Sequence, residues 1–277
     1  MDIREIIYQF RWRLGFTILI IIVEALLGVL FPYFIGQAID GMLHKNLSGI
    51  WNLGLLGGLL IIMGGFRRYF DSRFYAKIYI RISTIVLKFI PKEKHSLKTA
   101  RLNMLAEMVR FAENELPMIV QHSIGLIGVM TILAFLSWNT FLGALVTGAV
   151  VLFIYVLSGG RTLDYNHKFN NELESQVDVI RSNQQSGLRF HLLKLMRWNI
   201  KLSDIETINY SISWLIMMIL LIITIYFSAS EGVQYGALFA LIMYVYQYIE
   251  SVVSLPLYYQ HWLRLSEISK RIKNIVP

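Results

Sequence analysis

Two acidic residues stand inside long apolar stretches of this chain, and such acids are the side chains best able to do chemistry in it. Glu24 lies in LIIIVEALLGVL, and Glu250 lies in YVYQYIESVV. A carboxylate in hydrocarbon is costly unless it is protonated, paired or in contact with water. The position of Glu24 therefore indicates that it binds a proton or a cation or that it contacts a substrate. The alternative is a protonated side chain that hydrogen-bonds between packed helices.

Glu250 belongs to a stripe of side chains that recur at helical spacing. The stripe consists of Phe239, Met243, Tyr246, Gln247, Glu250 and Ser254. A partly polar stripe on a membrane helix faces a cavity or a partner helix. Glu250 thus has two interpretations. It lines a cavity together with Tyr246 and Gln247, or it is an acid near the inner membrane surface on a helix that only packs against other helices.

A pair of arginines, Arg67 and Arg68, follows the short apolar run LGLLGGLLIIMGGF without a break. Long basic side chains at the end of a membrane helix can extend to the lipid headgroups. The alternatives are that the arginines pair with Glu24 or Glu250, or that they bind an anionic group. The candidate site residues are therefore Glu24, Glu250, Arg67, Arg68, Tyr246 and Gln247.

Other kinds of site are not indicated. The chain has no cysteine, so it has neither a disulfide framework nor thiol chemistry. Its 6 histidines are scattered and form no H-E-x-x-H, which argues against a zinc site. His122 either relays a proton or lies at the membrane interface. No Ser/His/Asp set indicates catalysis, so we expect no enzymatic activity, no cofactor and no metal.

Six apolar stretches must position these residues. Stretches of ~20 apolar residues are long enough to cross ~30 Å of hydrocarbon. We predict spans over about 14–38, 50–72, 117–137, 139–158, 208–228 and 234–259. Counted from the inner end of the first span, Glu24 falls ~15 Å deep, near the bilayer midplane. Residues 1–13 place several apolar side chains on one face, which predicts an interfacial helix.

The basic residues are distributed asymmetrically between the loops. Of the 26 Lys and Arg residues, all but Lys45 can be placed on one side of the membrane. Because basic loops mark the cytoplasmic side, we predict a multi-pass protein of the bacterial inner membrane with both termini in the cytoplasm. The net charge of +8 follows from the same bias, so the expected partner is the lipid bilayer and not nucleic acid.

The two long inner segments, 67–116 and 159–207, have charged, helix-permissive sequence with a break near the middle. The break is Pro91 in the first segment and the polar run SNQQSG, 182–187, in the second. Each segment therefore predicts a helical hairpin that reaches ~36 Å from the bilayer. The predicted hairpin tips contain Pro91, Lys92, Gln184, Gln185 and Gly187.

Several stretches resemble the transmembrane domain of type IV ABC exporters. FPYFIGQAIDGML, 31–43, is similar to the family's Pro…Gly-x-x-Ile-Asp pattern, and FYAKIYIRISTIVLKFI, 74–90, resembles the segment leading to the first coupling helix. The last span resembles the family's sixth, with a Gly near its outer end, a central Tyr and a later Pro. The resemblance covers nearly the whole chain.

This resemblance implies an all-α membrane protein with six transmembrane helices and two long cytoplasmic helical hairpins, forming a single domain over 1–277. It also implies a homodimer in which two copies enclose the pathway and exchange helices four and five. The chain departs from the family pattern in having no G-x-x-x-x-G-K-[ST] phosphate loop, so we expect no nucleotide-binding domain. The LSGGR at 157–161 is interpreted as a chance match to the ABC signature.

Three functions are compatible with this sequence. The first is a transporter without its own ATPase, which moves a substrate down its gradient or couples it to an ion or proton gradient; the family includes peptide transporters that lack ATPase domains. The second is the membrane subunit of an ABC transporter whose separate ATPase binds the hairpin tips. The third is an ion channel or regulatory membrane protein, with the carboxylates around the dimer axis.

Overall fold

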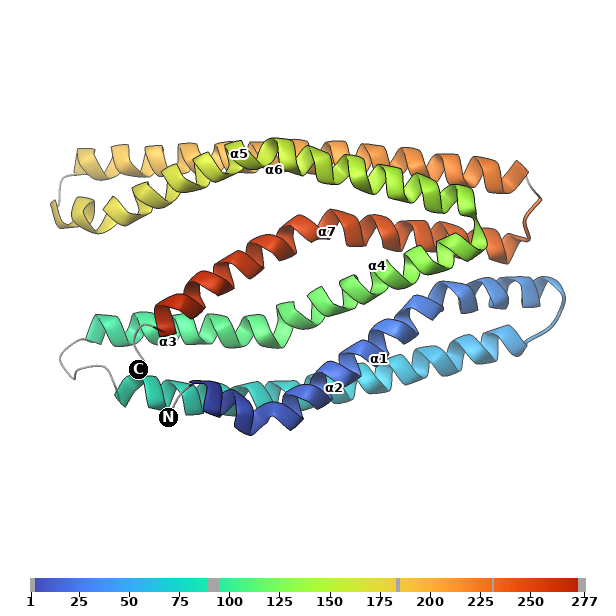
Figure 1. Ribbon diagram of the computed structural model, residues 1–277, viewed down its shortest axis with the longest axis horizontal. Helices are drawn as coiled ribbons and strands as arrows, with labels where there is room; N and C mark the ends of the chain where they lie inside the picture. Colours follow the sequence, from blue (N-terminus) through green and yellow to red (C-terminus); the bar gives the residue numbers. More distant parts are fainter. Residues whose placement is uncertain (1–2, 89–94, 183–184, 231, 274–277) are drawn as a thin grey trace. The chain divides into compact units, whose positions relative to one another are not determined.

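The computed structural model describes residues 3–88, 95–182, 185–230 and 232–273, which are almost entirely helical and include no strand. The elements are α1 (Ile3–Leu43), α2 (Ser48–Lys88), α3 (His95–Arg110), the π-helical turn η1 (Phe111–Glu115), α4 (Leu116–Leu136), α5 (Trp138–Ser182), α6 (Gln185–Ser230) and α7 (Tyr235–Lys273) (Figure 1).

Six helical segments are long and apolar enough to cross a membrane, which confirms the predicted all-α membrane fold. Helices α1, α2, α5 and α6 are 41 to 46 residues long. At ~1.5 Å per residue each is more than ~60 Å long, about twice the thickness of the hydrocarbon layer. A large part of each helix must therefore extend beyond the membrane, as the predicted hairpins require.

The breaks between helices differ in part from the predicted ones. Residues 3–13 continue into the first span as one helix, so the interfacial segment predicted over 1–13 is not a separate element. Gln185 and Gly187 already belong to the first turn of α6, because a helix N-terminus tolerates polar residues and glycine whose N–H groups lack intrahelical partners. Three predicted tip residues lie outside the described residues: Pro91, Lys92 and Gln184.

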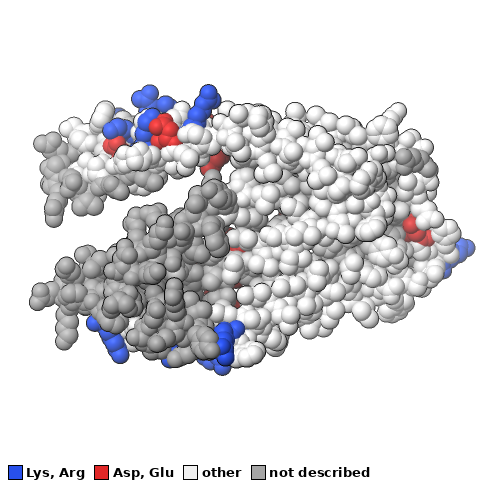
Figure 2. Space-filling model, in the orientation of Figure 1, with Lys and Arg blue, Asp and Glu red and all other residues white. Residues whose placement is uncertain are grey.

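The chain divides into two compact units. Unit 1 consists of 1–138 and 225–277, and in it α1 packs against α2, α4 and α7 (Figure 1). Its fully buried side chains include Ile21, Val129, Leu133, Tyr244, Val245 and Ile249. Unit 2 consists of 139–224, the hairpin of α5 and α6. In Figure 2, the visible Lys and Arg of unit 2 gather toward one end of its helices, whereas those of unit 1 lie at both ends, with a broad uncharged surface between them.

Polar side chains as well as apolar ones join α5 to α6 in unit 2. Near the middle of the hairpin, the Nδ2 of Asn209 donates to the hydroxyl of Ser158 at 2.7 Å. Closer to its turn, Glu172 contacts His191 at 2.9 Å and Lys194 at 2.7 Å. The two helices are therefore paired along the hairpin, and part of that pairing lies beyond the apolar stretches.

A short turn carries the one basic residue predicted on the outer side. Lys45 has a φ of 56°, the left-handed conformation that a tight turn between two helices demands. The Oδ1 of Asn46 accepts a hydrogen bond of 2.9 Å from the N–H of Ser48, where α2 begins. This turn fixes α1 and α2 as antiparallel neighbours.

Close backbone contact brings α7 against α1 at this same end of unit 1. A Cβ at Gly36 would lie 2.5 Å from the carbonyl oxygen of Gly236, so neither position has room for a larger residue. The Oδ1 of Asp40 accepts a hydrogen bond of 2.7 Å from the N–H of Gly236, in the first turn of α7. A carboxylate there satisfies an otherwise unpaired donor and interacts favourably with the helix dipole.

We expect Gly36→Ala to destabilise the protein by about 1–3 kcal/mol, because the new methyl group overlaps a backbone atom that cannot rotate away. Gly28→Ala is the matched control on the same helix, since a Cβ there meets no described heavy atom outside its own helix within 4 Å. Thermal unfolding in detergent measures the difference. Equal melting temperatures for the two variants would contradict the close contact of α1 and α7.

Candidate functional site

A buried ion pair joins α1 to α2 in unit 1. The Nε of Arg67 donates to Oε2 of Glu24 at 2.7 Å, and the Nη1 of Arg67 lies 3.5 Å from Oδ2 of Asp71. Glu24 is 7% exposed and Asp71 is 2% exposed. Removing either partner of such a pair leaves an uncompensated buried charge, so the pair holds the two helices together.

Two neutral side chains complete this group. The Nε2 of Gln121, on α4, donates to Oε2 of Glu24 at 3.2 Å. The buried hydroxyl of Thr17 donates to Oδ1 of Asp71 at 2.9 Å. We call the five residues Thr17, Glu24, Arg67, Asp71 and Gln121 the charge cluster. It links three helices of unit 1.

Helical spacing explains why these residues meet. Thr17 and Glu24 are two turns apart on α1, and Arg67 and Asp71 are one turn apart on α2, so each pair lies on one helical face. Glu24 and Arg67 are also equally far, ~28 Å, from the turn that joins α1 to α2. For a turn at the outer surface of a ~30 Å hydrocarbon layer, the cluster lies near the inner surface, beyond the midplane position predicted for Glu24.

One oxygen of each carboxylate has no hydrogen-bond donor among the described residues. These atoms are Oε1 of Glu24 and Oδ2 of Asp71. Oε1 of Glu24 faces Gly64 of α2, where a Cβ would lie 3.6 Å away. Two carboxylates thus face one guanidinium group, and the cluster has one negative charge in excess when both acids are ionised.

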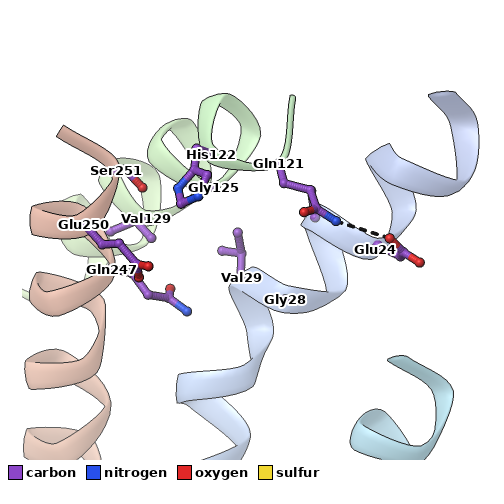
Figure 3. Close-up of a pocket in the computed structure, with 11 residues that line it drawn as sticks. Glu24, Gly28, Val29, Gln121, His122, Gly125, Val129, Gln247, Glu250 and Ser251 are labelled. Atoms are coloured by element: carbon purple, nitrogen blue, oxygen red, sulfur yellow. Dashed lines mark hydrogen bonds between the residues drawn. The ribbon is translucent and has the colours of Figure 1, made fainter. Parts of the chain in front are cut away.

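A cavity of about 280 Å³ opens beside the cluster, among α1, α4 and α7 (Figure 3). Its polar lining consists of Glu24, Gln121, His122, Gln247, Glu250 and Ser251, and its apolar lining of Ala25, Gly28, Val29, Gly125 and Val129. In Figure 3, Gln247 and Glu250 extend from α7 into the space between the helices, and Gln121 reaches from α4 to Glu24. Glu24 therefore belongs to both the cluster and the cavity.

The predicted site residues divide into three groups. Arg67 pairs with Glu24, so for this arginine the pairing alternative is confirmed over extension to the headgroups. Arg68 is exposed and lies outside the cluster. On α7, Gln247 and Glu250 line the cavity, and Tyr246 is exposed on the same side of the helix. The opposite face of α7 is the buried one, with Tyr244, Val245, Tyr248 and Ile249.

Three residues of the cluster were missed by the sequence analysis: Thr17, Asp71 and Gln121. Asp71 carried the clearest signal, because it follows Arg67 by one helical turn and could pair with it. It falls at the predicted end of the second span, where an acidic residue is usually solvated. Thr17 and Gln121 are neutral, and polar neutral side chains are common in membrane helices.

Residues 3–242 match the protein family described as ABC transporter transmembrane region. This chain belongs to that family. No curated protein matches it. Membership in the ABC transporter transmembrane family, together with six membrane-capable helices, gives the protein a transport-type role in a lipid bilayer.

The structure gives physical reasons for the sequence features that resemble ABC exporters. Gly36 and Asp40 of the FPYFIGQAIDGML stretch both meet Gly236 of α7, so the motif positions the first and last membrane helices. The LSGGR sequence lies within α5, and its Ser158 accepts a hydrogen bond from Asn209 of α6. In this ABC transporter transmembrane region, LSGGR therefore takes part in helix pairing.

We expect Arg67→Gln to destabilise the protein by about 3–5 kcal/mol, because it leaves the buried carboxylate of Glu24 without a counter-charge. The exposed neighbour Arg68→Gln is the control and should unfold like the wild type in the same detergent. Adding Glu24→Gln to Arg67→Gln should restore part of the lost stability. If both arginine variants unfold at the same temperature, the ion pair does not hold the helices.

Proposed function

We propose that this protein moves a substrate across the membrane along a path that includes the cavity among α1, α4 and α7. The observation that carries the proposal is the polar lining of this cavity within helices that are otherwise apolar. A cavity of about 280 Å³ accommodates a small polar group or part of a larger molecule. Its carboxylates favour a substrate group that is cationic or that donates hydrogen bonds.

The driving force in this proposal is an ion or proton gradient, and ATP hydrolysis is not needed for transport. What supports it is Glu24, which lines the cavity and belongs to the charge cluster, so an ion or proton that enters from the cavity and binds in the cluster can influence the helices that the cluster joins. Glu250 is the second coupling residue of the proposal, because its side chain enters the same cavity. The protein carries out no chemical conversion of its substrate.

The proposal places the protein in the bacterial inner membrane as a homodimer, with both termini in the cytoplasm. Support for the dimer comes from the division of the chain into two units, because unit 2 contains the two long helices that the ABC exporter fold exchanges between copies. Support for the orientation comes from Lys45, which lies in the turn between α1 and α2, whereas the other basic residues can all be placed on the opposite side.

A second candidate function is the membrane subunit of a transporter with a separate ATPase. The observation that favours it is a largely apolar groove at the start of α6, at the tip of the second hairpin. The groove measures about 630 Å³ and is lined by Gln185, Ser186, Leu188, Arg189, Leu192, Leu193 and Met196. Exposed apolar surface of this kind at a hairpin tip fits a protein partner.

Uptake into proteoliposomes that contain only this chain tests the two candidates. A cationic dye and a labelled basic peptide are supplied with an imposed pH gradient and without nucleotide. Uptake that depends on the gradient supports the proposal. Equal flux with and without the gradient indicates a channel, and flux that appears only after an ATPase partner and ATP are added favours the second candidate.

We expect Gly125→Leu to reduce uptake strongly without lowering the melting temperature. Its Cβ meets no described heavy atom outside its own helix within 4 Å, so the side chain fills the cavity with little steric overlap. Gly57→Leu on α2 is the matched control, because its Cβ is equally unobstructed and Gly57 does not line the cavity. Uptake that stays at the wild-type rate in Gly125→Leu would place the path elsewhere.

A further inference from the structure

We infer that the charge cluster is a proton-binding site, in which Oδ2 of Asp71 holds one proton while Glu24 stays ionised against Arg67. The binding of the proton follows from the cluster alone. Its use in driving transport rests on the proposed function. Asp71 was not among the sequence candidates, and the inference assigns to it the proton-binding role that the sequence analysis considered for Glu24.

The charges of the cluster do not balance when both of its acids are ionised. Two carboxylates and one guanidinium leave one negative charge in excess, in a group whose acids are 7% and 2% exposed. An uncompensated carboxylate in a low-dielectric interior is costly, and taking up a proton is the usual way in which a buried acid avoids that cost. One bound proton makes the cluster neutral.

The two acids of the cluster differ in their hydrogen bonds. Oε2 of Glu24 accepts from Arg67 at 2.7 Å and from Gln121 at 3.2 Å, and both bonds favour the ionised form. Asp71 accepts one short bond, from Thr17 to Oδ1, and its Oδ2 lies 3.5 Å from Arg67 without a donor. Oδ2 of Asp71 is therefore the atom best placed to hold the proton.

Other charged and titratable groups surround the cluster. On α2, Arg67 lies beside Asp71, and both Asp71 and Glu113 of η1 are close enough to Tyr75 to interact with it electrostatically. His122 of α4 and Glu250 of α7 line the cavity next to Glu24. Among the residues that the structure describes, Arg67 is the cation that lies beside both acids. The negative groups on the neighbouring elements strengthen the case for an added proton.

The ligand is a proton in preference to a metal ion. Within the described parts of the chain, no group of three or more His, Asp and Glu side chains could hold a metal. The guanidinium of Arg67 already occupies the space beside both acids and would repel a second cation. A proton needs no coordination shell, and Glu24, which lines the cavity and belongs to the cluster, offers a route between water and Asp71.

Infrared spectroscopy of the purified protein in a maltoside detergent, which contains no carbonyl group, tests the binding of the proton. A protonated carboxylic acid gives a carbonyl stretch separate from the carboxylate bands. We expect this band at neutral pH in the wild type and in the control Asp204→Asn, an exposed position on α6, and its loss in Asp71→Asn. A wild type without the band, or a band that persists in Asp71→Asn, overturns the inference.

A measurement without any substitution guards against a variant that fails to fold. Wild-type protein from cells grown with carbon-13-labelled aspartate should show the same band at a lower frequency, because the isotope is then in the carboxyl group whose C=O stretch gives the band. A band that does not move on aspartate labelling assigns the proton to a different acid and overturns the inference.

Transport measurements separate this inference from the proposed function. In proteoliposomes we expect Asp71→Asn to lose the part of the uptake that depends on the pH gradient, whereas Asp204→Asn keeps it. Gradient-driven uptake by a wild type that lacks the aspartate band would leave the proposed function standing and overturn the proton site. A wild type that has the band and transports nothing would confirm the proton site and overturn its role in coupling.

Discussion

The burial of Arg67 against Glu24 is the interaction on which the rest of unit 1 depends. The guanidinium and the carboxylate lie 2.7 Å apart inside a membrane domain. Burying either charge there without its partner would cost much free energy, so the pair fixes α1 and α2 in one register. Gln121 adds α4 to the same acid through a hydrogen bond. Apolar packing between lipid-compatible helices is weakly specific, and this polar contact supplies the specificity that packing lacks.

Two fixed points then define how the helices of unit 1 are arranged. At one end, Asp40 and the glycine pair Gly36 and Gly236 hold α7 close to α1. Along α1 from that contact, the charge cluster holds α2 and α4. Between α1, α4 and α7, small residues such as Gly28 and Gly125 leave a cavity, and the polar side chains of α7 enter it. The polar cavity thus results from the close contact of α1 and α7 at one end of unit 1 and from the small side chains of α1 and α4 farther along these helices.

Much of this arrangement could be predicted from the sequence, because membrane spans depend on composition and length. The six membrane-capable segments and the unusual character of Glu24 follow from hydropathy and charge alone. The pairing of Glu24 with Arg67 was only one of several alternatives, because the sequence does not say which faces of α1 and α2 meet. Asp71 was missed because burial of an acid at the predicted end of a span depends on how far the helix continues. The cavity was also beyond prediction, because it arises where three helices separated in the chain come together.

The central claim is that water reaches a polar cavity next to a buried charge cluster, and thiol labelling tests it most directly. The chain contains no cysteine, so a single cysteine can be introduced without removing others. We predict that Gly125→Cys, in the cavity, reacts with a charged, membrane-impermeant thiol reagent, whereas Leu133→Cys, fully buried on the same helix α4, does not. A Gly125→Cys protein as unreactive as Leu133→Cys would contradict the account, because no aqueous path would then reach Glu24.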